Sequence, residues 1–386
     1  MIAARTPRTS ALSDRLLVLN SKNSLHSTGA TQAIHIEDSY IGDFHTHLRL
    51  HDLLVVNDSA TLPASLQTTL PSGGQAEVRL VSSEEDGSYL ALLFGEGNWK
   101  TTTEVRPLPE IVSIGTILPI TDRLTARIEA YERRCKSGRL IRISFNLEKA
   151  PLLREIYRAG KPIQYSYMDQ EIALWSVQNV YAGRPWSVEM PSAGRALSSA
   201  VLLKLRQHGV AIASLTHAAG ISSTGDPDLD AQLPFKERYE ILEETVRAIA
   251  TARSHGGRII AVGTSVVRAL ESSALKNAAS PIASASLGYS PIASASLGYS
   301  PVAGASVDGS PVAGVDETDL IIEPGFDLQI VDGLLTGMHE STESHFKLLE
   351  AFAPRSLLEA ALQHAERERY LTHEFGDSCL IFSNST

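Results

Sequence analysis

The sequence predicts an α/β layered domain with a largely parallel sheet, into which a small antiparallel β-barrel is inserted. Between about residues 67 and 162, short alternating polar and apolar segments are separated by Gly, Asp and Asn turns, a pattern typical of a barrel. Beyond Trp186, strand-like and helix-like segments alternate, which favours a parallel sheet covered by helices. The 386 residues suffice for roughly two or three domains. We therefore expect a barrel at 67–162 and a discontinuous α/β domain at 1–66 and 163–386.

The first half of the chain supplies one buried strand and then the barrel. The continuous apolar run from Leu53 to Val56 indicates a buried strand, which Asn57 and Asp58 end. The expected barrel strands alternate in polarity and are QAEVRLV (75–81), YLALLF (89–94), LTARIEAYE (124–132) and RLIRISFN (139–146).

The second half predicts an alternation of strands and helices. The expected elements are a strand at 210–218, a helix over 235–257 that stops at two glycines, a buried strand at 258–264, a helix directly after it at 265–275, an apolar segment at 319–324, a helical stretch over 344–370 with a break at Pro354, and a final strand at 378–382. Such an order is typical of a layered α/β domain.

A tandem decapeptide interrupts this half. SPIASASLGY occurs at 280–289 and again at 290–299, followed by the degenerate copies SPVAGASVDG and SPVAG. The units contain small residues, a proline each and one charge at Asp308, so they offer too little apolar surface to form a core. We expect a flexible surface insertion over 280–314, because solenoid repeats need longer units.

Composition limits the function classes. A net charge of −10, from 34 basic and 44 acidic residues, opposes non-specific adhesion to nucleic acid, although a local basic patch can still bind it. Cys135 and Cys379 lie far apart in no metal-ligand spacing, so no disulfide framework, zinc site or other metal site is indicated. No apolar run reaches the length of a signal peptide core or a membrane span, and we expect a cytoplasmic protein without a membrane partner.

Two turns are candidate ligand sites. The segment VEMPSAGRALSS (188–199) predicts a strand end, a turn containing Ser192 and Gly194, and the start of a helix, where unpaired N–H groups gather. A strand also leads directly into a helix at Gly263, Thr264 and Ser265, and this is the stronger candidate. A simple connection is the alternative for each turn.

Five stretches in order resemble one family. They are LLVVNDSATLPASL, VQNVYAGRPWSVEMPSAG, LKLRQHGVAIASLTHAAG, GGRIIAVGTSVVRALES and FGDSCLIF, and together they span about Arg15 to Phe382. The chain thereby resembles the S-adenosylmethionine:tRNA ribosyltransferase-isomerase family of queuosine biosynthesis, as a divergent member. Members of that family have an α/β domain with an inserted β-barrel, which agrees with the pattern of strands and helices above.

The resemblance implies a reaction. Family members transfer and isomerise the ribosyl part of S-adenosylmethionine onto a 7-deazaguanine base in a tRNA anticodon, and they release adenine and methionine. S-adenosylmethionine is then a substrate, and no metal is implied. The chemistry requires a base that removes a proton from the carbon next to the sulfonium, and a hydrogen-bond donor near the leaving adenine. It also requires basic residues that contact the tRNA phosphates, and a pocket for the target base after it is turned out of the stack.

Several family residues are replaced in this chain. The family has Leu-His-Phe-Thr after the first turn, where this chain has Arg195 followed by Ala196. In THAAGISST, His217 lies one position earlier than the family histidine, and QLPFKERYE lacks the two histidines of the family segment. The late family loop keeps Thr336 and His339. These exchanges predict weak or absent activity on the queuosine-precursor tRNA.

The candidate catalytic residues are His339, Asp58 and His217. His339 has the chemistry of a base or an adenine donor and matches a family histidine, although a lone histidine is more often structural. Asp58 either caps its turn or lines the pocket. His217 lies one position earlier than the family histidine, and in a strand this shift would turn its side chain to the opposite face of the sheet.

The candidate cofactor-binding residues are those of the two turns, namely Gly263, Thr264, Ser265, Ser192 and Gly194, together with two arginines. Arg268 either holds a carboxylate by two hydrogen bonds or is a solvated helix residue. Arg195 is either a new anion contact or an exposed residue at a helix start.

The leading hypothesis is a ribosyltransferase-isomerase acting on tRNA. The alternatives are an S-adenosylmethionine-using enzyme with a non-tRNA acceptor and a catalytically silent binding paralogue.

Overall fold

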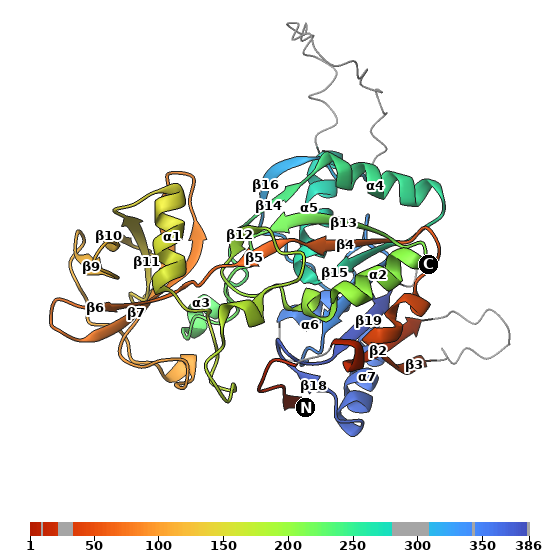
Figure 1. The fold of residues 1–386 in the computed structure, drawn as a ribbon, viewed down its shortest axis with the longest axis horizontal. Coiled ribbons are helices and arrows are strands. Elements are labelled where there is room, and N and C mark those ends of the chain that lie inside the picture. The colour runs from red at the N-terminus through yellow and green to blue at the C-terminus, as the bar shows by residue number, and fades with distance from the viewer. Residues whose placement is uncertain (9–10, 22–33, 280–308, 342–343, 384–386) are drawn as a thin grey trace, which may run out of the picture.

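The protein consists of a large mixed sheet covered by helices and a smaller antiparallel sheet at one end (Figure 1). The structure is a computed structural model and describes residues 1–8, 11–21, 34–279, 309–341 and 344–383. Most of the decapeptide insertion expected at 280–314 therefore lies outside the described residues. Its last six residues are described, and there Val312 N–H donates to Ser273 Oγ at 2.8 Å.

The large sheet carries its parallel strands in the centre. In the described residues its order is β16 (Gly314–Thr318), β14 (Glu237–Ile241), β13 (Ala211–His217), β4 (Leu53–Asn57), β15 (Ile259–Val262), β17 (Gly333–Gly337), β19 (Ser378–Phe382), β2 (Arg15–Ser21) and β3 (Ile34–Tyr40). Strands β13, β4, β15 and β17 run parallel, as do β19 and β2, while the other neighbouring pairs are antiparallel. The predicted α/β fold class is confirmed, with a sheet that is mixed towards its edges.

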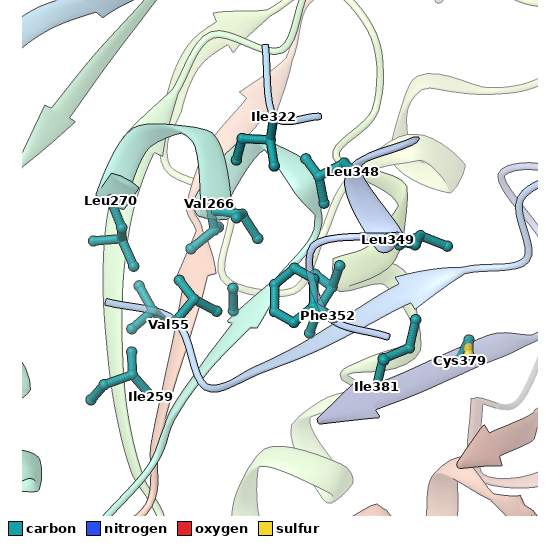
Figure 2. Close-up of a cluster of buried hydrophobic side chains, with 14 of the residues drawn as sticks. Val55, Ile259, Val266, Leu270, Ile322, Leu348, Leu349, Phe352, Cys379 and Ile381 are labelled. Atoms are coloured by element: carbon teal, nitrogen blue, oxygen red, sulfur yellow. The ribbon is translucent and has the colours of Figure 1, made fainter. Parts of the chain in front are cut away.

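Alternation along the strands divides the core between the two faces of the sheet. Leu53 and Val55 of β4 belong to the core under α4 (Glu243–Ser254), α5 (Thr264–Ala279), α6 (Ser344–Leu349) and α7 (Arg355–Arg367). Figure 2 shows this core, with Val55 facing Val266 and Leu270 of α5. Leu54 and Val56 point to the other face, under α2 (Ser199–Gln207) and the 3₁₀ turns η2 (Ile41–His47) and η5 (Ser192–Ala196).

The smaller sheet forms a nearly closed barrel. Its strands, in spatial order, are β6 (Ser65–Thr69), β7 (Gln75–Ser83), β8 (Tyr89–Phe94), β11 (Leu140–Phe145), β10 (Thr125–Tyr131) and β9 (Ile117–Pro119). Neighbours pair antiparallel, and Thr68 Oγ1 donates to the Pro119 carbonyl at 2.9 Å across the two end strands. Leu152 and Ile156 of α1 (Lys149–Ala159) pack into the barrel core.

The chain enters and leaves the barrel at one point. Ser65 N–H donates to the Lys161 carbonyl and Lys161 N–H donates to the Ser65 carbonyl, both at 2.9 Å. This paired crossing lies within two residues of the expected limits at 67 and 162. The division into domains nevertheless stays a prediction.

Two short pairings complete the strands. β12 (Arg184–Ser187) runs parallel to β5 (Ser59–Thr61), the strand that follows the carboxyl end of β4. At the N-terminus, β1 (Ile2–Ala3) pairs with β18 (Leu371–Thr372). The remaining described helical segments are the short helix α3 (Pro227–Asp230) and the 3₁₀ turns η1 (Ala11–Ser13), η3 (Thr103–Val105) and η4 (Leu174–Val177).

Three sequence expectations need correction. The helix expected over 235–257 begins only at Glu243, because Tyr239 and Ile241 form β14 between two partner strands. The strand near the apolar segment 319–324 is β16, which ends before that segment. The helix after the Pro191 turn begins at Ser199, because Ser198 caps it and η5 precedes it. The expected break at Pro354 is confirmed by the separation of α6 and α7.

Candidate active site

The carboxyl ends of four neighbouring parallel strands define the candidate site. Ligands of open α/β sheets bind outside this edge, because the following turns and helix N-termini gather there. Every residue predicted for the site lies at or beside this edge: His217 at the end of β13, Asp58 after β4, Gly263, Thr264, Ser265 and Arg268 after β15, His339 after β17, and Ser192, Gly194 and Arg195 in η5.

The two predicted turns contact each other. Gly263 has a φ of +89°, and a Cβ added there would lie 3.4 Å from the Cβ of Ala193 in η5. The N–H of Gly263 donates to the Leu335 carbonyl of β17 at 2.8 Å, which fixes the turn to the sheet. Helix α5 then begins at Thr264, and the N–H groups of its first turn have no acceptor within the helix. The contact therefore places a helix N-terminus beside the η5 turn.

Gly194 allows the η5 turn to pack closely. A Cβ at this position would collide with the Tyr181 hydroxyl and would lie 2.6 Å from Asn179 Nδ2. The Tyr181 hydroxyl and Asn179 Oδ1 are buried and lack a hydrogen-bond partner among the described residues. Burial raises the pKa of Tyr181, and the negative charge of Asp58 adds to this effect. Two polar groups are therefore available to a ligand beside the turn.

Asp58 is held by the neighbouring strand. Its carboxylate accepts hydrogen bonds from Thr216 Oγ1 at 2.6 Å and from Ser214 Oγ at 3.0 Å. Its N–H donates to the Leu215 carbonyl at 2.9 Å, so both side chain and backbone bind β13. This fixes a negative charge at the edge of the sheet.

His217 belongs to a buried polar cluster on the face of the sheet that α4 and α5 cover. Its Nε2 lies 3.5 Å from Glu237 Oε2, and neither ring nitrogen makes a hydrogen bond within the described chain. Burial lowers the pKa of His217 to about 4; Glu237 opposes this shift and the positive charge of Arg268 adds to it. The imidazole is therefore neutral at physiological pH.

Arg268 has a protein partner. Its guanidinium forms an ion pair with Glu237, and its Nε donates to the Leu320 carbonyl at 2.9 Å. Only 8% of the residue is exposed, which excludes the alternative of a solvated helix residue. One atom, Nη2, is buried without a hydrogen-bond partner among the described residues. A role in holding a ligand carboxylate stays a prediction and would have to use that atom.

His339 lies away from His217. Its Nε2 is 2.9 Å from Thr336 Oγ1, and its ring stacks on that of His345 with centroids 5.0 Å apart. The end of β17 is three strand positions from β13, so the two backbones are separated by roughly 14 Å at about 4.8 Å per strand. The structure therefore places the two histidines at opposite ends of the candidate site.

Arg195 is part of an ion-pair network. Its Nη2 lies 3.0 Å from Asp14 Oδ2, and Arg8 bridges Asp14 and Asp377 at 3.0 and 2.7 Å. The Arg195 side chain is 12% exposed, so the alternative of an exposed residue at a helix start is wrong. Asp14 neutralises this guanidinium, and its role as an anion contact stays a prediction.

Sequence reasoning missed three residues of this site. Glu237, Tyr181 and Asn179 contact predicted residues, but each comes from a segment without a ligand motif. The one signal is that Tyr181 and Asn179 lie within the stretch that also contains the η5 turn.

The described residues contain neither a metal-binding cluster nor a membrane-spanning helix. No group of three or more His, Cys, Asp or Glu side chains there could hold a metal ion. Among the described helices, none is both long enough and apolar enough to cross a membrane.

Comparison with known proteins identifies relatives over the whole chain. A sequence model of the family described as "Queuosine biosynthesis protein" matches residues 1–381. The S-adenosylmethionine:tRNA ribosyltransferase-isomerase of Acidithiobacillus ferrooxidans is 30% identical over 354 residues, which cover 89% of this chain and 87% of the relative. The protein of the same name from Thermus thermophilus is 31% identical over 345 residues, with 88% and 87% covered.

A solved structure also matches. It is described as an S-adenosylmethionine tRNA ribosyltransferase from Thermotoga maritima, has 23% identity and a TM-score of 0.47, and the match covers 98% of this chain and 96% of that one. Because the family's sequence model spans nearly the full length, this chain belongs to the queuosine biosynthesis protein family.

Proposed function

We propose that the protein is an S-adenosylmethionine-dependent ribosyltransferase-isomerase that acts on tRNA in the cytoplasm. The observation that carries the proposal is the contact between Gly263 and Ala193, which joins the two predicted turns at the carboxyl edge of the sheet. The curated relatives named above have this activity in their names and cover most of the chain. Family membership and site geometry therefore support the same function.

The edge of the sheet fits S-adenosylmethionine. When bound, this substrate supplies the ribosyl group and a sulfonium that acidifies the neighbouring C–H. Its polar groups need partners, and four residues here have buried polar atoms without a hydrogen bond among the described residues: Asn179, Tyr181, His217 and Arg268. The N–H groups at the start of α5 add donors for a carboxylate or a ring nitrogen. We assign the binding of S-adenosylmethionine to this edge.

His339 and His217 suit different roles in proton transfer. His339 is partly exposed, and its hydrogen bond with Thr336 orients the ring, so it is our candidate for the base. His217 is fully buried and neutral, which suits a neutral hydrogen-bond partner better than a base that must gain a proton. Asp58 provides fixed negative charge where positive charge develops during loss of adenine.

The distribution of charge favours the barrel as the tRNA-binding part. Residues 65–162 contain 14 Lys and Arg against 12 Asp and Glu, which leaves 20 against 32 for the rest of the chain. The barrel is therefore slightly positive while the remainder carries the whole negative excess. Local positive charge of this kind attracts phosphate at low salt.

The test is direct. The protein is incubated with S-adenosylmethionine, with and without precursor-bearing tRNA, and adenine and methionine are measured by mass spectrometry. Release that depends on tRNA supports the proposal, whereas equal release without tRNA favours a non-tRNA acceptor. Binding of S-adenosylmethionine without release identifies a silent paralogue. A Gly194→Ala variant serves as the control, because its turn cannot pack.

A further inference from the structure

A second polar cavity lies between the segment after the barrel and the large sheet. It holds about 30 Å³ and opens to solvent on one side. Among the residues that line it are Tyr165, Tyr167, Glu189 and Glu374, while Met190 and Phe375 contribute apolar walls. Met190 immediately precedes Pro191, so the cavity adjoins the η5 turn of the candidate active site.

Glu189 forms one side of the cavity. Its Oε1 accepts hydrogen bonds from the Tyr165 hydroxyl and, at 3.2 Å, from the Ser222 N–H. The Tyr165 hydroxyl also lies 3.0 Å from Ser222 Oγ. No donor among the described residues contacts Oε2, and this atom remains able to accept from a ligand.

Glu374 also lines the cavity. Its Oε2 accepts a hydrogen bond from the Tyr167 hydroxyl, and no described side chain donates to Oε1. The Tyr167 ring stacks between that of Tyr165, with centroids 6.2 Å apart, and that of His373, at 4.3 Å. Aromatic faces thus border a space that two carboxylates also reach.

Neither carboxylate has a cationic partner. No Lys, Arg or His of the described chain lies within ion-pair distance of Glu189 or Glu374, although Arg79 is near enough to lower the pKa of Glu189 slightly while pairing with Glu77. Burial is the larger influence and raises the pKa of Glu189, and it raises that of Glu374 to about 7. Both residues are partly buried, and a carboxylate removed from water without a counter-charge is costly, a cost that a cationic ligand removes.

We propose that this cavity, bounded by Glu189 and Glu374, binds a primary ammonium group of a substrate. An ammonium group carries three N–H donors and is small enough for a space of this volume. Two carboxylates supply acceptors and charge, and the ring of Tyr165, which also lines the cavity, adds cation–π attraction. The aromatic and apolar side chains that also line the cavity suit an organic cation better than a hard metal ion, which prefers a shell of oxygen ligands.

The inference rests on the proposed function for the identity of the substrate. S-adenosylmethionine carries such an ammonium group on its methionyl part, and an amine on the acceptor is the other source. Both present the same chemistry to the cavity, so binding measurements must separate them.

The experiment uses calorimetry with two probes. S-adenosylmethionine carries the ammonium group, and 5′-methylthioadenosine shares its adenosine part but lacks it. The proteins are wild type, Glu189→Gln and Glu374→Gln, which keep the side-chain shape, with Glu171→Gln as the matched control. Glu171 lies in the same segment, is 52% exposed and pairs with Lys161 at 2.7 Å.

If the methionyl ammonium occupies the cavity, each of the two variants binds S-adenosylmethionine about tenfold more weakly or worse, while affinity for methylthioadenosine stays unchanged. If an acceptor amine occupies it, S-adenosylmethionine affinity stays constant and KM for the acceptor tRNA rises by about the same factor. Unchanged affinity and KM in both variants would overturn the inference while leaving the proposed function intact. Failure of wild type to bind S-adenosylmethionine would instead overturn the proposed function, and this inference with it.

Melting temperatures provide a check that needs no ligand. At about pH 8 the two variants should melt at the same temperature as wild type or higher, because each replaces a partly buried carboxyl group that lacks a counter-ion with a neutral amide. A markedly lower melting temperature in both variants would mean that other groups of the protein already stabilise the charges of these two carboxylates. That result would overturn the inference.

Discussion

The guanidinium of Arg268 pairs with the carboxylate of Glu237 beneath the first turn of α5. The same carboxylate accepts a 2.7 Å hydrogen bond from the N–H of Gly220, which follows β13. One ion pair thus ties α5, β14 and the loop after β13 together at the edge where we place the substrate. Arg268 is therefore a structural element of the site, whatever it contributes to binding.

Replacing Arg268 should destabilise the protein strongly. Arg268→Ala leaves Glu237 nearly buried without its partner, and we expect a loss of roughly 3 kcal/mol in the free energy of unfolding. Arg247→Ala is the control, because that α4 side chain is 67% exposed and should cost less than about 0.5 kcal/mol. Urea denaturation followed by circular dichroism measures both. Equal stability of the two variants would contradict the assignment.

Gly194→Ala should disrupt the η5 turn. The added methyl would collide with the Tyr181 hydroxyl and Asn179 Nδ2, so the turn can no longer pack against these two residues as it does now. Because either the turn or the polar groups of Tyr181 and Asn179 must then shift, we expect affinity for S-adenosylmethionine to fall by about tenfold or more, measured by calorimetry. Gly74→Ala in the barrel is the control, because a Cβ there meets only Ser72 Oγ at 3.5 Å. The steric argument fails if both variants bind equally well.

Stability should depend on the titration of Glu374. Burial raises the pKa of this group in the folded protein from 4.5 to about 7, with the Tyr167 hydroxyl and the second carboxylate, Glu189, nearby. The folded state therefore holds the proton more tightly. The associated stability is complete below about pH 4.5 and is lost as the pH rises through 7, by an amount on the order of 3 kcal/mol.

Denaturant titrations of wild type and Glu374→Gln between about pH 5 and pH 8 test this dependence. The difference in unfolding free energy between the two proteins should grow in favour of the variant as the pH rises. Parallel profiles would show that Glu374 does not titrate in this range.

Removal of residues 280–308 should leave stability nearly unchanged. The flanks are already joined, since Asn277 Nδ2 donates to the Ser310 carbonyl at 3.1 Å and Val312 binds Ser273. A short Gly-Ser linker can therefore close the gap, and loop-closure entropy changes only slowly with length. We expect a melting temperature within about two degrees of wild type and equal S-adenosylmethionine affinity. A loss of several degrees would show that the repeat packs against the protein.

Charge reversal on the β10–β11 hairpin should weaken tRNA binding. Arg133, Arg134 and Lys136 are exposed there, and Lys136 is 90% exposed. The double variant Arg133→Glu, Lys136→Glu should lower affinity roughly tenfold and reduce the slope of log K against log salt by about 2. Arg367→Glu on α7 is the exposed control. Gel-shift titrations at several salt concentrations measure the effect, and equal slopes would place the tRNA elsewhere.

Continuous apolar runs and turn residues made most of the fold predictable. The strands at Leu53–Asn57 and Ser378–Phe382 lie where the sequence places them, because each is buried on both faces. Residues 237–241 were misassigned, since Phe235, Tyr239 and Leu242 also fit a helical spacing. Pairing with β13 and β16 decides their conformation, and that pairing joins segments distant in sequence.

The candidate site was predictable only in part. Turns such as Gly263–Ser265 follow a local rule about strand ends, and the structure shows them at the expected edge. The partners of Arg195 and Arg268 were not predictable, because Asp14 lies 181 residues from Arg195 and Glu237 lies 31 residues from Arg268. The cavity of Glu189 and Glu374 likewise joins segments with no common motif. Charge pairing across a fold leaves no pattern in the local sequence.

The double hydrogen bond between Ser65 and Lys161 brings the two ends of the barrel segment together at one crossing. Since its two ends leave the large sheet side by side, a bridge of a few residues could replace everything between them without displacing β4 or β12. Equally, the excised segment would have adjacent termini, the geometry that favours circular permutation and transplantation into another host. An exchanged barrel would also have to cover Ile221, Leu229 and Phe235, because these side chains share a buried apolar core with barrel strands β8 and β11.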